Sequence, residues 1–290
     1  MITELKQTST FGGLTYDVVF KQFFTNKLDI VSRLLSEIIN MNINQEDITF
    51  LNIEHVGSSK KTKNSLLDLK VKLPNEDYII IEMQNCYTDN FYKRIQYYTS
   101  KVISEQLDVA KDYQTLKKVY CISFLSGIDK SGKNQYPKLF TSEVLCDKIS
   151  KEERPAIFEY CFINLEKLYN NNYDFSKFAL SFFKLMNIKR EEDLDNMDIK
   201  DESIKESVNY VKMINDNPVI KAEIDKEHRE RLAYNSDISF ATNDGYKKGI
   251  KKGTKDTQLS IAKTMLEENI NIDLISKVTS LSIDEIKKYI

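Results

Sequence analysis

The 290-residue sequence contains few of the residues that build metal–thiolate or metal–imidazole sites, with four cysteines and two histidines. The cysteines lie far apart in mostly apolar surroundings, and no two of them form a C-x-x-C pair. This spacing argues against a structural zinc site. It favours reduced, packed thiols, as expected for a protein of the cytosol.

A large excess of charge is also absent, because 42 Lys and Arg residues nearly balance 44 Asp and Glu residues. Any nucleic-acid partner would therefore have to be held by a local basic patch or through a metal. No run of 18 apolar residues occurs, and the amino terminus lacks the basic and apolar regions of a signal peptide. We expect a cytoplasmic globular protein with no membrane partner, and 290 residues suffice for a substantial core.

The most informative segment lies at residues 66–84, where two stretches of alternating apolar and polar residues flank the turn sequence P-N-E at 74–76. This pattern predicts a β-hairpin. With those three residues as the loop, Asp68 lies directly opposite Glu82, and Gln84 lies on the same face. Opposed side chains in such a pair have Cβ atoms about 4.5–5.5 Å apart.

Two carboxylates at this separation repel each other unless a positive charge lies between them. A hard divalent cation with oxygen ligands is one answer, and it predicts a metal site at Asp68 and Glu82. The alternative is an ordinary polar surface, in which Lys70 and Lys72 on the same face neutralise the acids. The spacing alone leaves both interpretations open.

Hydrophobic periodicity predicts the other elements of the first 170 residues. The first predicted helix contains Asp17 and Lys21 one turn apart, and the third contains Arg94 and Tyr98 one turn apart. The expected helices cover 16–24, 30–39 and 91–107, and the further expected strands cover 48–54, 118–125, 139–145 and 157–165. This order predicts an α/β fold with a mixed sheet, antiparallel at its start and flanked by helices.

Strand signals vanish beyond Asp174, so we expect an all-helical carboxy-terminal region, with helices over 174–186, 199–215 and 218–235. Gly245, Gly249 and Gly253 recur at intervals of four among five lysines, a pattern open to either a helix or a flexible linker. The expected domains are a catalytic core at 1–170, a helical subdomain at 171–240, a Gly/Lys-rich connector or helix at 241–257, and a small helical tail at 258–290.

The tail has three short apolar stripes, and Ser282 and Glu285 form a capping box that begins the last helix. Three short helices within residues 258–290 would fit a helix-turn-helix unit, an oligomerisation element, or a small cap on the main domain. The last helix carries mixed charge, so DNA reading is not favoured over a structural role.

Several motifs follow one another along nearly the whole chain. They are YDVVFK at 16–21, the strand with Asp68, IEMQ at 81–84, R-x-x-x-Y at 94–98, IAKTMLE at 261–267 and L-S-x-x-E-I at 281–286. Together they resemble the Rpn family of recombination-promoting nucleases, also labelled transposases, of the PD-(D/E)XK nuclease superfamily. The resemblance implies a restriction-endonuclease-like mixed sheet.

The resemblance also implies roles for five residues. Asp68 and Glu82 would be the two metal-binding acids, holding Mg²⁺, or Mn²⁺ or Ca²⁺ in its place. Gln84 would occupy the position where most of the superfamily has a lysine, and a glutamine amide cannot supply that positive charge. Asp17 and Lys21 match the family's early acid and the basic residue one turn after it.

The activity that the resemblance implies is a divalent-metal-dependent DNA endonuclease of the bacterial cytoplasm, with a tail that self-associates into a homo-oligomer. Its expected setting is DNA recombination or defence against mobile elements or phage. Arg94, Tyr98 and Lys70 are the expected DNA contacts, and Lys21 or Lys70 would compensate for the missing lysine. The alternative is a catalytically weak or inactive DNA-binding, oligomerising protein derived from a nuclease.

Overall fold

The computed structural model describes residues 10–51, 54–55, 65–66, 68–85, 89–107, 112–127, 136–197 and 199–288. The chain divides into two compact units, Met1–Glu227 and His228–Ile290. The division at Glu227 differs from the expected boundary at residue 170, because the helices after that point share the hydrophobic core of the first unit. The expected loop over 57–64 lies outside the described residues.

The helices of the first unit begin and end close to where the apolar periodicity places them. They are α1 (Asp17–Asn26), α2 (Leu28–Ile39), α3 (Asp89–Ser104), α4 (Lys177–Met186), α5 (Glu191–Asp195) and α6 (Glu202–Asp216), followed by the start of α7 (Pro218–Glu267). Short 3-10 turns lie at Gln45–Asp47, Tyr113–Thr115 and Leu165–Lys167.

The described strands form a six-stranded mixed sheet in the order β1-β4-β5-β6-β8-β7. They are β1 (Thr49–Phe50), β4 (Leu69–Lys72), β5 (Tyr78–Gln84), β6 (Val119–Leu125), β7 (Phe140–Glu143) and β8 (Phe158–Asn164), and the short β2 (Glu54–His55) and β3 (Ser65–Leu66) pair separately. The first three strands are antiparallel, β5, β6 and β8 are parallel, and β7 is antiparallel. The expected mixed sheet is confirmed.

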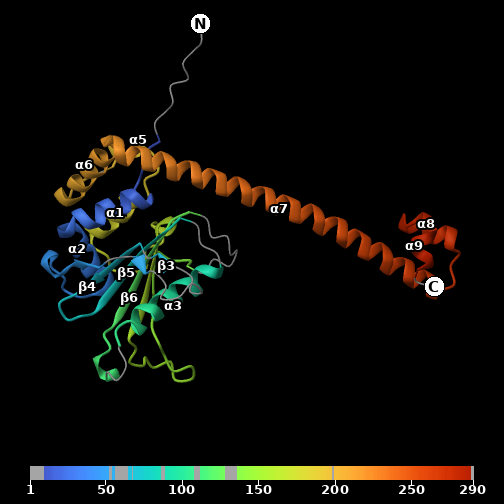
Figure 1. Ribbon diagram of the computed structural model, residues 1–290, viewed down its shortest axis with the longest axis horizontal. Helices are drawn as coiled ribbons and strands as arrows, with labels where there is room; N and C mark the ends of the chain where they lie inside the picture. The colour runs from blue at the N-terminus through green and yellow to red at the C-terminus, as the bar shows by residue number, and fades with distance from the viewer. Residues whose placement is uncertain are drawn as a thin grey trace, which may run out of the picture. The chain divides into compact units, whose positions relative to one another are not determined.

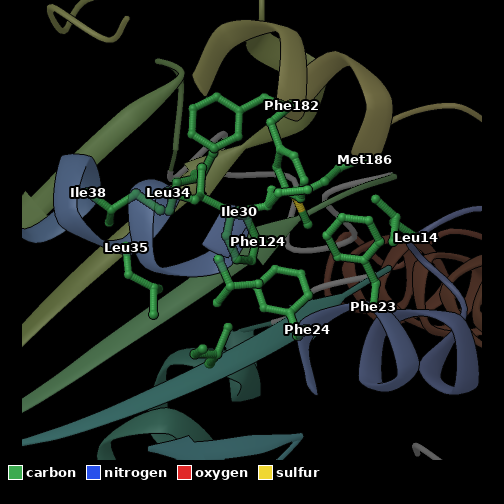
Figure 2. Close-up of a cluster of buried hydrophobic side chains, with 14 of the residues drawn as sticks. Leu14, Phe23, Phe24, Ile30, Leu34, Leu35, Ile38, Phe124, Phe182 and Met186 are labelled. Carbon is green, nitrogen blue, oxygen red and sulfur yellow. The ribbon is translucent and has the colours of Figure 1, made fainter. Parts of the chain in front are cut away.

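Helices cover both faces of this sheet (Figure 1). On one face α1, α2, α4 and α6 pack over β5 and β6 in a core rich in phenylalanine. Figure 2 shows Phe23 and Phe24 of α1, Phe124 of β6 and Phe182 of α4 gathered in this core. The rings of Phe23 and Phe182 lie 5.4 Å apart and tilted, a favourable arrangement for aromatic pairs.

The opposite face is covered by α3. Its apolar residues Phe91, Ile95 and Val102 form a second buried cluster with Ile80 of β5 and Cys121 of β6. Glu82 and Lys70 on this face of the hairpin are only 4% and 6% exposed, so the ordinary-surface interpretation does not hold for these two residues. Charged groups on this face lie under a helix, where each needs a partner.

The β7 edge of the sheet is closed at one residue by a side chain. The main-chain N–H of Phe140 donates to Asn172 Oδ1 at 3.1 Å, and Asn172 Nδ2 donates to the carbonyl of Phe140 at 3.0 Å. Asn172 thus bonds Phe140 as a neighbouring strand would.

The second unit contains the remainder of α7, followed by α8 (Ile272–Thr279) and α9 (Ile283–Lys287). Helix α7 is continuous through Gly245, Gly249 and Gly253, so the helical interpretation of the glycine segment holds. The expected capping box is confirmed, since Ser282 Oγ accepts the N–H of Glu285 while the Glu285 carboxylate accepts the N–H of Ser282.

Two further observations bear on the sequence expectations. Within the described residues, Cys121 and Cys161 are buried free thiols, but Cys146 is exposed, so the packed-thiol prediction fails at that position.

None of the described helices is both long enough and hydrophobic enough for a membrane span.

Candidate active site

The register of the β4–β5 hairpin is the one expected from its turn. Leu69 pairs with Ile81 and Val71 pairs with Ile79, so the next position along places Asp68 across from Glu82. The loop over 74–76 is tight, and Glu76 within it has a φ of 69°. The two acids therefore meet at the end of the ladder, where β4 begins.

Both carboxylates are tied to the backbone of the opposite strand. The N–H of Met83 donates to Asp68 Oδ2 at 2.7 Å, and the N–H of Asp68 lies 3.4 Å from Glu82 Oε1. Glu82 is only 4% exposed, because α3 covers this face. The hydrogen bond from Met83 holds one oxygen of Asp68, and each carboxylate retains further lone pairs for a cation.

This burial determines the protonation chemistry of the pair. Burial raises the pKa of Asp68 to about 6, while the hydrogen bond from Met83 and the positive charges of Lys21 and Arg94 oppose the rise. Burial, reinforced by repulsion from Asp68, raises the pKa of Glu82 to about 8. A divalent cation bound between two such adjacent carboxylates would stabilise their ionised forms.

Helix α1 brings Asp17 and Lys21 into the electrostatic reach of the pair. Lys21 Nζ lies 2.9 Å from both carboxylate oxygens of Asp17, one turn away on the same helix. Asp17 raises the pKa of Asp68, and Lys21 lowers the pKa values of Asp68 and Glu82. The two predicted residues are therefore near the acids, as an ion pair rather than as separate groups.

The start of α1 is held at two points that the sequence analysis missed. Asn85, which follows Gln84, donates its side-chain N–H to the carbonyl of Thr15 at 2.7 Å. The N–H of Asp17 donates to Glu227 Oε2 at 3.0 Å, so a carboxylate satisfies the first free donor of the helix. No local pattern signals either contact, since each joins residues distant in sequence.

Gln84 and Arg94 are joined by a hydrogen bond from the Arg94 guanidinium to Gln84 Oε1. Arg94 lies on α3 one residue before the buried Ile95, so its side chain leaves the helix beside the face that packs on the sheet. Its charge also lowers the pKa values of Asp68 and Glu82. Arg94 therefore brings a cation to the strand position where Gln84 lacks one.

Tyr98 and Lys70, the other expected DNA contacts, are placed differently. Tyr98 lies on α3 and packs against the buried cluster between α3 and the sheet, and burial raises the pKa of its hydroxyl. Lys70 is 6% exposed, its ammonium group lies 3.3 Å from Glu105 Oε2, and it also lies over the ring of Tyr78. The Lys70 ammonium group thus forms an ion pair with Glu105. The expectations that Lys70 neutralises the acids or contacts DNA are not supported.

The donor set fits a hard divalent cation better than zinc. Within the described part of the chain, no three His, Cys, Asp or Glu side chains cluster closely enough to hold a metal ion. Asp17 forms an ion pair with Lys21 beside the two acids. Two carboxylates, with the remaining positions taken by water or substrate oxygens, are a coordination pattern that Mg²⁺ commonly adopts.

The comparison with protein families decides the classification of this arrangement. The family model described as PD-(D/E)XK nuclease family transposase matches residues 14–241, a span that contains all the acids of the site. The chain belongs to this family. Comparison with curated proteins and with solved structures found no match.

Membership in the PD-(D/E)XK nuclease family confirms the expected superfamily and its mixed sheet flanked by helices. The matched span covers the first unit from residue 14 onward and the beginning of the second. The family supports a nuclease-type hydrolase that acts on DNA, and nucleases of this class generally use divalent metal ions.

Proposed function

We propose that this protein is a divalent-metal-dependent DNA endonuclease that hydrolyses phosphodiester bonds at Asp68 and Glu82. The observation that carries the proposal is that Glu82 is buried and faces the partly buried Asp68 across the end of a hairpin. Two adjacent carboxylates in this environment cost free energy when both are ionised, and a bound cation offsets that cost.

Asp68 and Glu82 would hold the cation, with Mg²⁺ or Mn²⁺ as the candidates. Such an ion supplies an activated water and neutralises charge on the scissile phosphate. The chain's own contribution is to fix the acids. The Met83 N–H orients Asp68, and α3 keeps bulk water away from Glu82.

Arg94 is proposed to compensate for the missing lysine. Its guanidinium occupies the oxygen of the Gln84 amide, which directs the amide's N–H donors away from Arg94. The guanidinium charge and these donors would then stabilise negative charge on a phosphate beside the acids. Lys21 adds a second positive charge, although its pairing with Asp17 reduces its effect.

The test is plasmid cleavage by the purified full-length protein with Mg²⁺ or Mn²⁺ and with a chelator. Asp68→Asn and Glu82→Gln keep the shape of each side chain, and we expect either variant to abolish cleavage. Glu159→Gln is the matched control, because Glu159 lies on β8 of the same sheet and bonds Lys118 instead of the acid pair. Cleavage that persists in both site variants, or that needs no divalent ion, would exclude this function.

A second candidate is a DNA-binding protein with little or no nuclease activity, favoured by the glutamine at the lysine position. It predicts that DNA is retained without metal and that an Asp68→Asn, Glu82→Gln double variant retains DNA equally well. A gel-shift titration with and without a chelator distinguishes the two candidates, because a nuclease that uses its metal to hold phosphate loses affinity in the chelator.

Homo-oligomerisation through the tail and a cytoplasmic role in recombination or in defence against mobile elements complete the proposal. The tail has a core of four buried residues, Ala262, Ile275, Leu281 and Ile286, while Ile261, Leu274 and Val278 are 44–58% exposed. So small a core gains stability by covering exposed apolar side chains with a second copy.

A further inference from the structure

Ser123 carries a hydroxyl group that has no evident use in the fold. It lies in β6, in the sequence V-Y-C-I-S-F-L, where it is the one hydroxyl-bearing aliphatic side chain in an otherwise apolar or aromatic strand. The side chain is 0% exposed. Its Oγ has no hydrogen-bond partner among the described residues, and an unpaired buried hydroxyl normally destabilises a protein.

The strand register places this hydroxyl beside the acid pair. Ser123 pairs directly with Glu82 across the parallel β5–β6 ladder, so the two side chains lie on the same face of the sheet. Neighbouring strands are about 4.8 Å apart, which puts Glu82 within reach of a serine hydroxyl directly or through one water molecule. This is the face that α3 covers, and Thr99 of α3 is buried there as well.

The other polar groups nearby do not satisfy the hydroxyl. Cys121 lies two residues earlier on the same face, where the hydroxyls of Ser123 and Thr99 partly offset the rise in its pKa that burial causes, but a thiol is too weak a hydrogen-bonding group to satisfy the Ser123 hydroxyl. The Thr99 hydroxyl already donates to the carbonyl of Ile95 at 2.9 Å. Glu82 is the strong acceptor that remains on this part of the face.

We propose that Ser123 is a positioning residue of the metal site, which donates a hydrogen bond to Glu82, or to a water on the metal beside it, when a divalent cation is bound. This inference rests on the proposed function. Acids that ligate metals are themselves held by hydrogen bonds, and loss of such a partner typically weakens metal affinity by about 10–100-fold. A hydrogen bond from this hydroxyl that forms when the metal binds would favour the bound form.

Three substitutions separate this role from packing. Ser123→Ala removes the hydroxyl, Ser123→Cys approximates its shape but donates weakly, and Ser123→Thr retains it. Ser207→Ala is the matched control, because Ser207 is also 0% exposed but its hydroxyl donates to the carbonyl of Ser203 within α6, away from the acids. Without metal, we expect Ser123→Ala to be at least as stable as the wild type, since it removes an unpaired polar group.

The experiment measures the thermal shift of each full-length protein as Mg²⁺ is added, and takes the concentration that gives half the maximal shift. We expect that concentration to rise at least tenfold in Ser123→Ala and Ser123→Cys, and to stay near the wild-type value in Ser123→Thr and Ser207→Ala. A wild-type protein that shifts with Mg²⁺, together with Ser123→Ala shifting at the same concentration, would overturn the role of Ser123 and leave the nuclease proposal intact. A wild-type protein that neither shifts with nor cleaves in Mg²⁺ or Mn²⁺ would overturn both.

Discussion

Glu82 shows how one side chain links the stability of the protein to its chemistry. Its pKa is raised from 4.5 to about 8, first by burial and then by Asp68. The folded protein therefore binds more protons than the unfolded chain between these pH values. Stability is full below the lower value and falls as pH rises through the upper one. A bound cation replaces the proton and removes this penalty.

The first prediction concerns Glu82→Gln in a chelator. We expect its melting temperature at pH 8 to exceed that of the wild type by several degrees, since each kcal/mol corresponds to about 2–4 °C in a domain of this size. The difference should shrink as the pH falls toward 4.5 and vanish below it, where the wild-type acid is protonated in both states. Differential scanning fluorimetry across this range measures it, and a variant less stable at pH 8 would refute the burial argument.

The second prediction concerns Arg94. Replacement by alanine removes both the charge near the acids and the bond to Gln84, and we expect kcat for DNA cleavage to fall by about 10²-fold. Arg94→Lys keeps the charge but not the planar fork, so it should retain part of the activity. Lys93→Ala, an exposed neighbour on α3, is the control. Equal rates for wild type and Arg94→Ala would remove Arg94 from the mechanism.

Sequence reasoning located residues well where the signal was local and poorly where it was not. The turn at 74–76 and the two-residue alternation of the flanking strands together predicted that Asp68 lies opposite Glu82. The partner of Lys70 is Glu105, at the end of α3, and no pattern near Lys70 points to it. The sequence shows Ser123 as a lone serine in an apolar strand, but its position beside Glu82 follows only from the β5–β6 register.

Most of the predicted helices and strands agree with the structure, but the expected helix over 218–235 and the first short helix of the tail belong to one helix, α7. The grouping of the helices also differs. Periodicity reports which face of a helix is buried but not what buries it. Helices α4 and α6 were therefore assigned to a separate subdomain, although Phe182, Val208 and their neighbours share a core with α1 and α2. The glycines at 245, 249 and 253 left the helix open to question in the sequence, although α7 continues through them.

The third prediction concerns those glycines. A Cβ atom built at Gly245, Gly249 or Gly253 meets nothing within 4 Å. Each replacement by alanine should therefore stabilise the helix by about 1 kcal/mol. We expect far-UV circular dichroism to show greater helix content and later melting in the triple variant.

Gly12→Ala is the contrasting control for the glycine variants. Its Cβ would lie 2.5 Å from Ile224 Cδ1, so this variant should be destabilised. A triple variant that loses self-association instead of gaining stability would show that the α7 glycines serve close contact with a second copy.

The chain consists of two units of very different size, and the smaller has the smaller core. Unit His228–Ile290 buries four hydrophobic side chains in its main cluster, whereas the first unit has two larger clusters. The metal site and the tail should therefore respond separately to substitution, unless DNA cleavage requires the oligomer.

The fourth prediction uses Ile275, which is 0% exposed in the tail core. Ile275→Ala removes about 2–5 kcal/mol of packing, more than so small a core supplies. We expect the variant to lose self-association by size-exclusion chromatography with light scattering while keeping the Mg²⁺-induced thermal shift. Lys263→Ala on the exposed surface of α7 is the control. An unchanged molar mass for Ile275→Ala would contradict assembly through the tail.

The two edges of the six-stranded sheet have a consequence for the behaviour of the protein at high concentration. Strand edges with unpaired backbone groups template fibrous aggregation. Here the β1 edge is two residues long, and the β7 edge has Asn172 bonded to both backbone groups of Phe140. Asn172 therefore shields one of the four β7 residues from pairing with a neighbouring molecule. Replacing this one asparagine would open part of that edge to polymerisation.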